Sequence, residues 1–294
     1  MSIETLIKRN KSLKPFTTFG IGGEARYFIE VRTISQMQEV RHYINREKIP
    51  YWVVGKGSNS LFDDRGFDGL VILNKIDFFE FEEGSLHVGA GFSFSLLGAK
   101  IARKKWGGLE FASGIPGTVG GAIYMNAGAN GKETCDHLTA VGVIDEEGRY
   151  LEKKNLPFSY RTSPFQNNRD IIVSGRFQLD KVENAREAQL KIIEYRTKTQ
   201  PYGEKSVGCI FRNPRDKSAG ALIEQCGLKG KKIGGAEVSL VHGNFIVNRE
   251  GATASDVLKL IELIRETVRE KTGEELEIEV RPIPYQLEDF HVPR

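Results

Sequence analysis

The sequence predicts a mixed α+β fold, because three segments have the apolar spacing of helices and several short runs between them have the spacing of strands. Glycine is unusually frequent: 32 of the 294 residues are Gly, about 11% against a usual share of about 7%. No segment repeats with a period of 20–50 residues, and none has low complexity. The chain is long enough for two or three subdomains, since one domain takes about 100–200 residues.

The first predicted elements surround a glycine cluster, Phe19–Ala25. Its glycines nearly match the G-x-G-x-x-G/A fingerprint of dinucleotide-binding proteins, in which a helix must follow. Because Arg26–Val31 has the composition of a strand, we reject a Rossmann phosphate site here. A helix comes later, where Thr33 and Gln36 have the spacing of a capping box. Its apolar face is formed by Ile34, Met37, Val40 and Ile44.

The second glycine cluster, Val54–Leu61, follows a predicted strand at Tyr51–Val54. It continues into Phe62–Gly66, which has the composition of a turn rather than of a helix, so this cluster is not a Rossmann start either. Further strands are predicted at Leu70–Leu73, Leu86–Val88, Ile171–Val173 and Phe245–Val247.

The third cluster is the densest and runs through Gly114–Ala122 and Asn126–Gly131. Backbone amides in such loops bind anionic oxygens, because glycine permits positive φ and lacks the Cβ that would block approach; a pyrophosphate would suit this loop. A Walker P-loop does not fit, since Glu133 stands where Ser or Thr must follow the lysine and Asn126 stands where the first Gly should be. Ordinary turns remain the alternative for this cluster taken alone.

Two further helices are predicted in the C-terminal half. One covers about Ala185–Arg196, ends before Pro201 and links two lobes. The other has Thr253 and Asp256 at its start, before its apolar stripe, and ends at Gly273. Its apolar stripe is formed by Val257, Leu260, Ile261, Ile264 and Val268.

Composition and charge exclude several classes of protein. The net charge of +3 is too weak to require a nucleic-acid partner, and the basic runs at 103–105 and 229–232 are typical of solvated faces. The start of the chain has no apolar leader, and no stretch approaches the roughly 18 apolar residues of a membrane span, so we expect a cytoplasmic protein. We expect neither a disulfide framework nor a metal site, because the five histidines lack ligand spacing and the cysteines form no C-x-x-C pair. The cysteines are Cys135, Cys209 and Cys226.

Six motifs, in this order, resemble those of one known family. They are Thr17–Gly23, Gly55–Leu61, Gly108–Gly128, Tyr160–Phe165, Gly208–Pro214 and Leu276–Val280. The family is UDP-N-acetylenolpyruvoylglucosamine reductase (MurB), flavoenzymes that make UDP-N-acetylmuramate for bacterial cell walls. The resemblance runs nearly end to end. Phe165–Arg196 is short where one branch of the family carries an extra Tyr-bearing loop, so the chain is similar to the compact branch.

The resemblance implies a vanillyl-alcohol-oxidase-type (PCMH-type) FAD-binding fold with three parts. Residues 1–74 and 75–195 would be the two FAD-binding subdomains, and 196–294 the UDP-sugar domain, whose C-terminal return carries Glu279. The family's flavin loops correspond to Gly55, Lys56, Gly57, Ser58, Asn59, Ser60, Gly114, Ile115, Pro116, Gly117, Thr118, Gly120, Gly121 and Ala122. Oxidases of this superfamily often tether FAD through His, and neither loop contains one, so we expect a non-covalent FAD.

The implied reaction has two halves, in which NADPH reduces FAD and the flavin then adds a hydride to the methylene carbon of UDP-N-acetylglucosamine enolpyruvate. An enolate remains, whose charge requires preorganised donors, and an Arg fork can bind both carboxylate oxygens. Arg161 matches the family's position for this fork, and Glu279 matches the family's catalytic Glu, although the alternating run 275–280 alone would place Glu279 on the solvent side of a strand. Cys209 stands where most of the family has the Ser that protonates C2. Its alternative role is a small buried hydrophobic residue.

The resemblance also implies substrate contacts from Tyr160, Arg212, Asn213, Glu224 and Lys229. We expect a monomeric enzyme of peptidoglycan precursor synthesis, in the bacterial cytoplasm, without a metal, nucleic-acid or membrane partner. Two other functions stay open: a flavin-dependent sugar-alcohol oxidase, and a non-catalytic protein that binds a UDP-sugar or flavin. The missing tethering His disfavours the oxidase, and intact Arg161 and Glu279 disfavour the non-catalytic protein.

Overall fold

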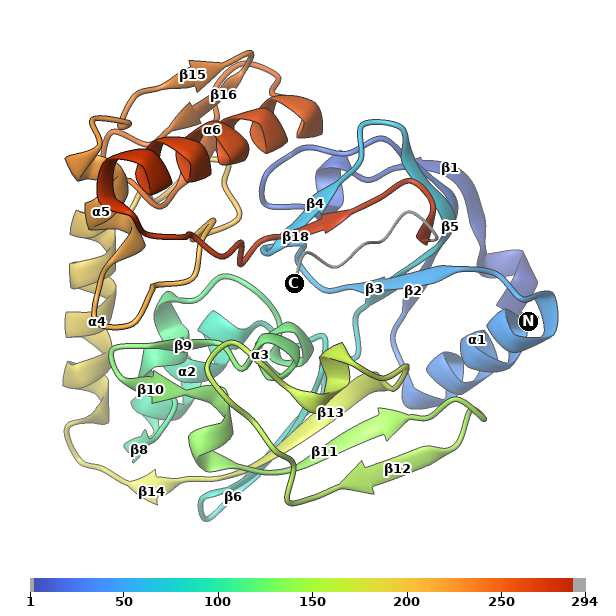
Figure 1. Cartoon of the computed structure of the whole chain (residues 1–294). Helices are drawn as coiled ribbons and strands as arrows, with labels where there is room; N and C mark the ends of the chain where they lie inside the picture. Colours follow the sequence, from blue (N-terminus) through green and yellow to red (C-terminus); the bar gives the residue numbers. More distant parts are fainter. Residues whose placement is uncertain (1–2, 288–294) are drawn as a thin grey trace. The chain divides into compact units, whose positions relative to one another are not determined.

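Residues 3–287 are described by a computed structural model, which divides the chain into two units, each with its own hydrophobic core (Figure 1). Unit 1 comprises the chain up to Lys8, Phe28–Gly55 and Leu70–Tyr195, and unit 2 comprises Arg9–Tyr27, Lys56–Gly69 and the chain from Arg196 onward. The last change of unit falls inside helix α4 (Ala185–Thr199), which is the helix predicted to link two lobes. The division into three domains stays a prediction.

Unit 1 is built on a five-stranded antiparallel sheet with the order β12-β11-β13-β7-β6. Its strands are β6 (Phe79–Glu82), β7 (Ser85–Gly89), β11 (Leu138–Ile144), β12 (Tyr150–Lys153) and β13 (Ile171–Gln178). Helices α2 (Phe94–Arg103) and α3 (Val119–Met125) share its core (Figure 1). Leu86 and Val88 point into that core, as the predicted strand requires.

A four-stranded sheet has the order β1-β2-β5-β3, and β3 and β5 run parallel. Its strands are β1 (Lys8–Ser12), β2 (Glu24–Val31), β3 (Tyr51–Val54) and β5 (Gly66–Asn74). The strand predicted after the first glycine cluster is therefore confirmed as β2. The strand predicted at Leu70–Leu73 is the second half of β5.

Helix α1 (Ile34–Glu47) begins as its sequence predicts, since the Thr33 hydroxyl accepts the backbone N–H of Gln36 at 3.1 Å. The second half of the capping box differs: the Gln36 side chain accepts from the backbone N–H of Arg32, one residue before the expected Thr33. Ile34, in the first turn, is only half-buried, so the apolar face begins at Met37.

Unit 2 places helix α6 (Ala254–Thr272) across a three-stranded sheet, β15-β16-β17 (Figure 1). The unit's elements are β4 (Ser60–Phe62), α5 (Ala219–Gln225), β15 (Lys232–Ile233), β16 (Ala236–Val238), β17 (Ile246–Asn248) and β18 (Arg281–Ile283). The predicted boundaries and buried stripe of α6 are confirmed, with a complete capping box at Thr253 and Gly273 at φ +75°. Strand β17 starts one residue later than predicted.

Short elements complete the described chain. They are β8 (Trp106–Gly107), β9 (Gly128–Ala129), β10 (Lys132–Glu133), β14 (Asp180–Lys181) and the 3₁₀ turns Ile3–Leu6, Lys14–Phe16, Glu110–Gly114, Thr134–His137 and Pro164–Gln166. None of the helices within residues 3–287 is long and apolar enough to cross a membrane. Those residues also contain no group of three His, Cys, Asp or Glu side chains placed to hold a metal ion.

We expect Thr253→Ala to lower the free energy of unfolding by about 0.5–2 kcal/mol, because the first turn of α6 loses the acceptor of the Asp256 N–H. Urea denaturation measures this difference. Thr253→Ser is the matched control and should retain most of the stability. Equal stabilities of the Ala and Ser variants would show that the cap contributes nothing.

Candidate functional site

The second glycine loop, in unit 2, has the geometry of an anion-binding nest. Gly57 lies at φ +59°, and a Cβ on it would stand 2.4 Å from the Phe16 carbonyl oxygen, so only glycine fits. Among the described residues, the backbone amides of Gly57, Ser58 and Asn59 have no acceptor. Consecutive unpaired amides beside a left-handed glycine are the arrangement that holds phosphate oxygens.

The third glycine cluster, in unit 1, presents a similar surface. Gly117 lies at φ +146°, and neither its amide nor that of Thr118 has an acceptor within residues 3–287. The Thr118 hydroxyl caps α3 by accepting the Gly121 N–H, and a Cβ on Gly121 would lie 3.6 Å from the Thr118 Oγ1 atom. The Ser113 hydroxyl next to this loop is buried and has no partner in the described part of the chain. These unused donors fit the diphosphate and hydroxyl groups of a dinucleotide.

The two glycine clusters meet in unit 1 at Gly55. A Cβ on Gly55 would stand 2.3 Å from the Thr118 Oγ1 atom, which leaves no room for a side chain. The approach explains why a glycine follows strand β3 directly. It also joins the start of one predicted flavin loop to the middle of the other.

We expect Gly57→Ala to reduce the amount of FAD bound per protein chain, because the new Cβ would push the loop away from Phe16. Gly203→Ala is the matched control: Gly203 also has a positive φ, +86°, in the same unit, but no atom of the described part of the chain lies within 4 Å of its Cβ position. Both variants carry the left-handed strain, and only the first distorts the nest. The absorbance ratio of flavin to protein measures the outcome, and equal FAD content in the two variants would contradict it.

Arg161 lies in a tight turn of unit 1 at a left-handed φ of +56°. The backbones of Ser159 and Thr162 close the turn with hydrogen bonds of 3.1 and 2.9 Å. The guanidinium donates to the Gly128 carbonyl oxygen at 3.1 Å, and its carbon lies 4.9 Å from the centre of the exposed Tyr160 ring. A left-handed backbone costs a non-glycine residue about 1–2 kcal/mol, so the fold holds this Arg in place at the expense of stability.

Neighbouring side chains tie this turn to the end of α3. The fully buried Asn126 donates to the Ser159 carbonyl oxygen at 3.0 Å, and Gln166 donates to the carbonyl oxygens of both Arg161 and Tyr124. Two of the motifs, Gly108–Gly128 and Tyr160–Phe165, therefore lie together in unit 1.

Cys209 and Glu279 are brought together in unit 2 by backbone pairing. The Ile210 carbonyl oxygen accepts the Glu279 N–H at 2.8 Å, and the Glu277 carbonyl oxygen accepts the Arg212 N–H at 2.8 Å. Cys209 itself bridges Phe245 and is half-buried. The motifs Gly208–Pro214 and Leu276–Val280, far apart in sequence, are thus neighbours.

The segment 275–280 differs from the strand that its alternation suggests. Only Ile278 forms a bridge, to Phe211, and the segment otherwise has no regular structure. Glu275 and Glu277 are exposed, as the pattern predicts, but Glu279 is half-buried. Asn59 explains part of this difference, since its side chain donates to the Glu279 carbonyl oxygen at 3.2 Å. The nest therefore lies beside Glu279.

The remaining predicted substrate contacts also lie in unit 2. Arg212 pairs with Glu277 at 2.9 Å, and Lys229 pairs with Glu224 at 3.0 Å. The side-chain oxygen of Asn213 accepts the Ala219 N–H at 3.0 Å at the start of α5, which leaves its amide nitrogen for another partner.

His242 lies close enough to Lys229 and Glu224 for their charges to act on its imidazole. Burial, together with the Lys229 ammonium, lowers the pKa of its imidazole. A neutral ring agrees with its Nδ1 atom accepting the Asn244 N–H at 3.1 Å.

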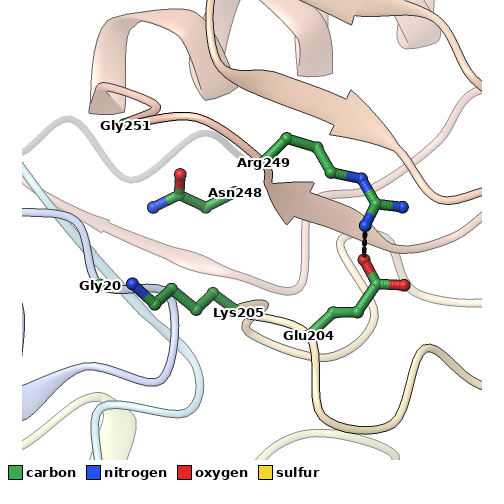
Figure 2. Close-up of a pocket in the computed structure, with 6 residues that line it drawn as sticks. All are labelled: Gly20, Glu204, Lys205, Asn248, Arg249 and Gly251. Carbon is green, nitrogen blue, oxygen red and sulfur yellow. Dashed lines mark ion pairs between the residues drawn. The ribbon is translucent and has the colours of Figure 1, made fainter.

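A pocket of about 320 Å³ in unit 2 contains none of the predicted site residues (Figure 2). Its lining residues are Gly20, Glu204, Lys205, Asn248, Arg249 and Gly251. Figure 2 shows Arg249 joined to Glu204 by an ion pair, and Lys205 is the other charged residue of the lining. The Asn248 side chain already bonds to the protein backbone, since it donates to the Phe19 carbonyl oxygen and accepts the Ala252 N–H.

The structure also contains a functional candidate that the sequence does not indicate. Asn244, buried next to Phe245, bonds to the backbone that follows Cys209. An Asn after a Gly suggests a turn, and no spacing in the sequence connects it with Phe211, 33 residues earlier.

Two family models match this chain. A family model described as FAD binding domain matches residues 25–153, which include both glycine loops, and one described as UDP-N-acetylenolpyruvoylglucosamine reductase, C-terminal domain, matches residues 200–283. A UDP-N-acetylenolpyruvoylglucosamine reductase from Protochlamydia amoebophila is 60% identical over 290 residues, which are 98% of this chain and 97% of the relative. One from Chlamydia trachomatis serovar A is 48% identical over 284 residues, 96% of this chain and 97% of the relative. The crystal structure of MurB from Thermus caldophilus has a TM-score of 0.80 at 37% identity, and the match covers 95% of this chain and 98% of that one.

Proposed function

The chain belongs to the UDP-N-acetylenolpyruvoylglucosamine reductase family, and on that premise we propose how its own residues carry out the reaction. The enzyme uses FAD and NADPH to reduce UDP-N-acetylglucosamine enolpyruvate to UDP-N-acetylmuramate. When bound, FAD accepts two electrons from NADPH and passes them to the enolpyruvyl double bond. The protein must hold the cofactor, bind the substrate carboxylate and deliver a proton to C2.

In unit 2, the amides of Gly57–Asn59 would bind phosphate oxygens of FAD. In unit 1, the amides of Gly117–Thr118 would likewise donate hydrogen bonds to FAD. The observation that supports this assignment is the set of backbone N–H groups in both loops that have no acceptor within residues 3–287. Lys56 and Ser60 would shape the loop of unit 2. Gly55 and the rest of Gly114–Ala122 would shape the loop of unit 1, with the buried Ser113 hydroxyl as a further donor. We propose that these contacts are non-covalent, because neither loop offers a His for a tether.

Arg161 would bind the substrate carboxylate and stabilise the charge that develops on it during reduction. Its guanidinium is planar and always charged, and the strained turn fixes its position before substrate arrives. The exposed Tyr160 ring beside it would form the wall of the same subsite.

Cys209 would donate the proton to C2, and Glu279 would assist at the same centre. The support for this pair is the backbone hydrogen bond from Glu279 to Ile210, which keeps the two residues in register. Arg212, Asn213, Glu224 and Lys229 would bind the UDP-sugar from the same unit.

A first test concerns the cofactor. The purified protein should be yellow, and acid or heat precipitation should release the yellow colour into the supernatant. Colour that stays with the precipitated protein would contradict a non-covalent flavin. A colourless, folded protein that cannot be reconstituted with FAD would contradict the loop assignment as well.

We further propose that the enzyme acts as a monomer in the bacterial cytoplasm and supplies a peptidoglycan precursor. Light scattering of the purified holoenzyme should give a mass near that of one 32.9 kDa chain. A mass of twice that value would exclude the monomer.

A further inference from the structure

The buried Asn244 side chain binds the backbone between Cys209 and Arg212 on both of its polar atoms. Its Oδ1 atom accepts the Phe211 N–H at 2.9 Å, and its Nδ2 atom donates to the Phe211 carbonyl oxygen at 2.8 Å. The Asn244 carbonyl oxygen also accepts the Ile210 N–H at 2.9 Å. Three of the four polar backbone groups of Ile210 and Phe211 are thus held by one residue, which is only 2% exposed.

The fourth group faces the opposite side. The Ile210 carbonyl oxygen accepts the N–H groups of Glu279 and Val280 at 2.8 and 3.3 Å. The dipeptide Ile210–Phe211 is therefore fixed between Asn244 and the segment that carries Glu279. Because both residues of the dipeptide are 1% exposed, water cannot replace a lost partner without opening the core.

We propose that Asn244 is a positioning residue for the substrate half-reaction: its side-chain amide sets the placement of Cys209 against Glu279. The inference rests on the proposed function, in which Cys209 donates the proton to C2. The Asn244 side chain accepts from and donates to the Phe211 backbone, as the peptide groups of a neighbouring strand would in a sheet. It does so where β17 has not yet started, immediately before Phe245, which bridges Cys209.

Asn244 is itself held in place by His242, two residues earlier in the chain. The Asn244 N–H donates to the Nδ1 atom of His242, whose ring packs edge-on against Phe245 with centroids 4.9 Å apart. This contact fixes the backbone of Asn244, and the one accepted and one donated bond to Phe211 fix the orientation of its side-chain amide.

Because Asn244 acts by positioning Cys209, its replacement should affect only the substrate half-reaction. Flavin reduction by NADPH requires no proton at C2 and should not depend on Asn244. Reoxidation by the enolpyruvyl substrate should depend on it, because a displacement of about 1 Å at a catalytic group can cost roughly 10²-fold in rate.

The test is stopped-flow kinetics of the FAD-loaded enzyme with Asn244→Ala, alone and combined with Cys209→Ala. We expect Asn244→Ala to slow reoxidation by roughly 10–10²-fold and to leave flavin reduction within a few-fold of wild type. In the Cys209→Ala background the same change should have little further effect, since two residues that act through one step are not additive. Asn248→Ala is the matched control, because the Asn248 side chain also bonds two backbone groups in unit 2, and these belong to Phe19 and Ala252.

The outcomes are distinguishable. If Cys209→Ala alone reoxidises normally, the proposed donor is wrong and the inference fails with it. If Cys209→Ala is slow but Asn244→Ala is normal, or slows both backgrounds equally, only the inference is wrong. Should Asn244→Ala not fold with FAD, Asn244→Asp replaces it, because that variant keeps the shape but loses the donor to the Phe211 carbonyl oxygen. Slow reoxidation with normal flavin reduction in Asn244→Asp, but not in Asn248→Ala, supports the inference, and normal reoxidation overturns it.

Discussion

Replacing Cys209 with Ala is expected to slow the reoxidation of reduced enzyme by the enolpyruvyl substrate by roughly 10²–10⁴-fold, the usual size of general acid catalysis. Flavin reduction by NADPH should proceed because it involves no enolate, whereas an enolate that is not protonated can return its hydride to the flavin and so delays net reoxidation. Stopped-flow absorbance separates the two steps. Near-normal reoxidation in the Ala variant would mean that Cys209 only fills space and that another group donates the proton.

The pH dependence gives the same residue a second test. A free thiol has a reference pKa of about 8.5, far below that of an alcohol, and an ionised thiolate cannot donate a proton. Turnover should therefore fall at alkaline pH in the wild type, and Cys209→Ser should remove that fall while keeping substantial activity. An alkaline limb that survives in the Ser variant would assign the titration to another group.

Alkylation of the Cys209 thiol gives a third test of its role as proton donor. Iodoacetamide should inactivate the enzyme, and bound UDP-sugar should protect it. Cys135→Ser is the control, because burial raises the pKa of the Cys135 thiol and keeps it less reactive. That variant should be inactivated like the wild type, whereas Cys209→Ser should resist.

Arg161→Ala and Glu279→Gln are expected to slow reoxidation by roughly 10²–10³-fold, the loss associated with one preorganised donor. Both should leave flavin reduction within a few-fold of wild type, since both residues act on the substrate and not on the nicotinamide. Arg149→Ala and Glu275→Gln are matched surface controls and should change neither step. Equal damage to both half-reactions would contradict these roles.

The left-handed backbone at Arg161 allows function and stability to be separated. Glycine adopts a φ of +56° without strain, so Arg161→Gly should lose reoxidation like Arg161→Ala and yet keep the thermal stability of the wild type. A Gly variant that is markedly less stable would show that the Arg side chain serves the fold instead.

Local patterns allowed part of the fold to be predicted. Helix α6 has its cap, apolar stripe and terminal glycine within one continuous segment, and all three are where the sequence indicates. The strand after the first glycine cluster was predictable for the same reason. The interleaved segments of the two units were not predictable, because no local signal records which distant strands pair.

In the candidate site, too, local motifs were predictable and contacts between distant segments were not. Arg161, Cys209 and Glu279 could be named from motifs, but the left-handed turn at Arg161 has no signal in its residue type. The half-buried state of Glu279 contradicts simple alternation, because Asn59 and Ile210 cover its backbone from other parts of the chain. Asn244 could not be found at all, since its role arises only from contacts with Phe211.

The most direct test of the account is anaerobic titration of the purified holoenzyme, first with NADPH and then with UDP-N-acetylglucosamine enolpyruvate. We predict that NADPH bleaches the flavin absorbance and that the enolpyruvyl substrate restores it without oxygen, with one UDP-N-acetylmuramate formed per flavin. Restoration by oxygen alone, while the enolpyruvyl substrate has no effect, would contradict the account and favour an oxidase. A protein that binds these ligands without any change in flavin absorbance would indicate a non-catalytic function.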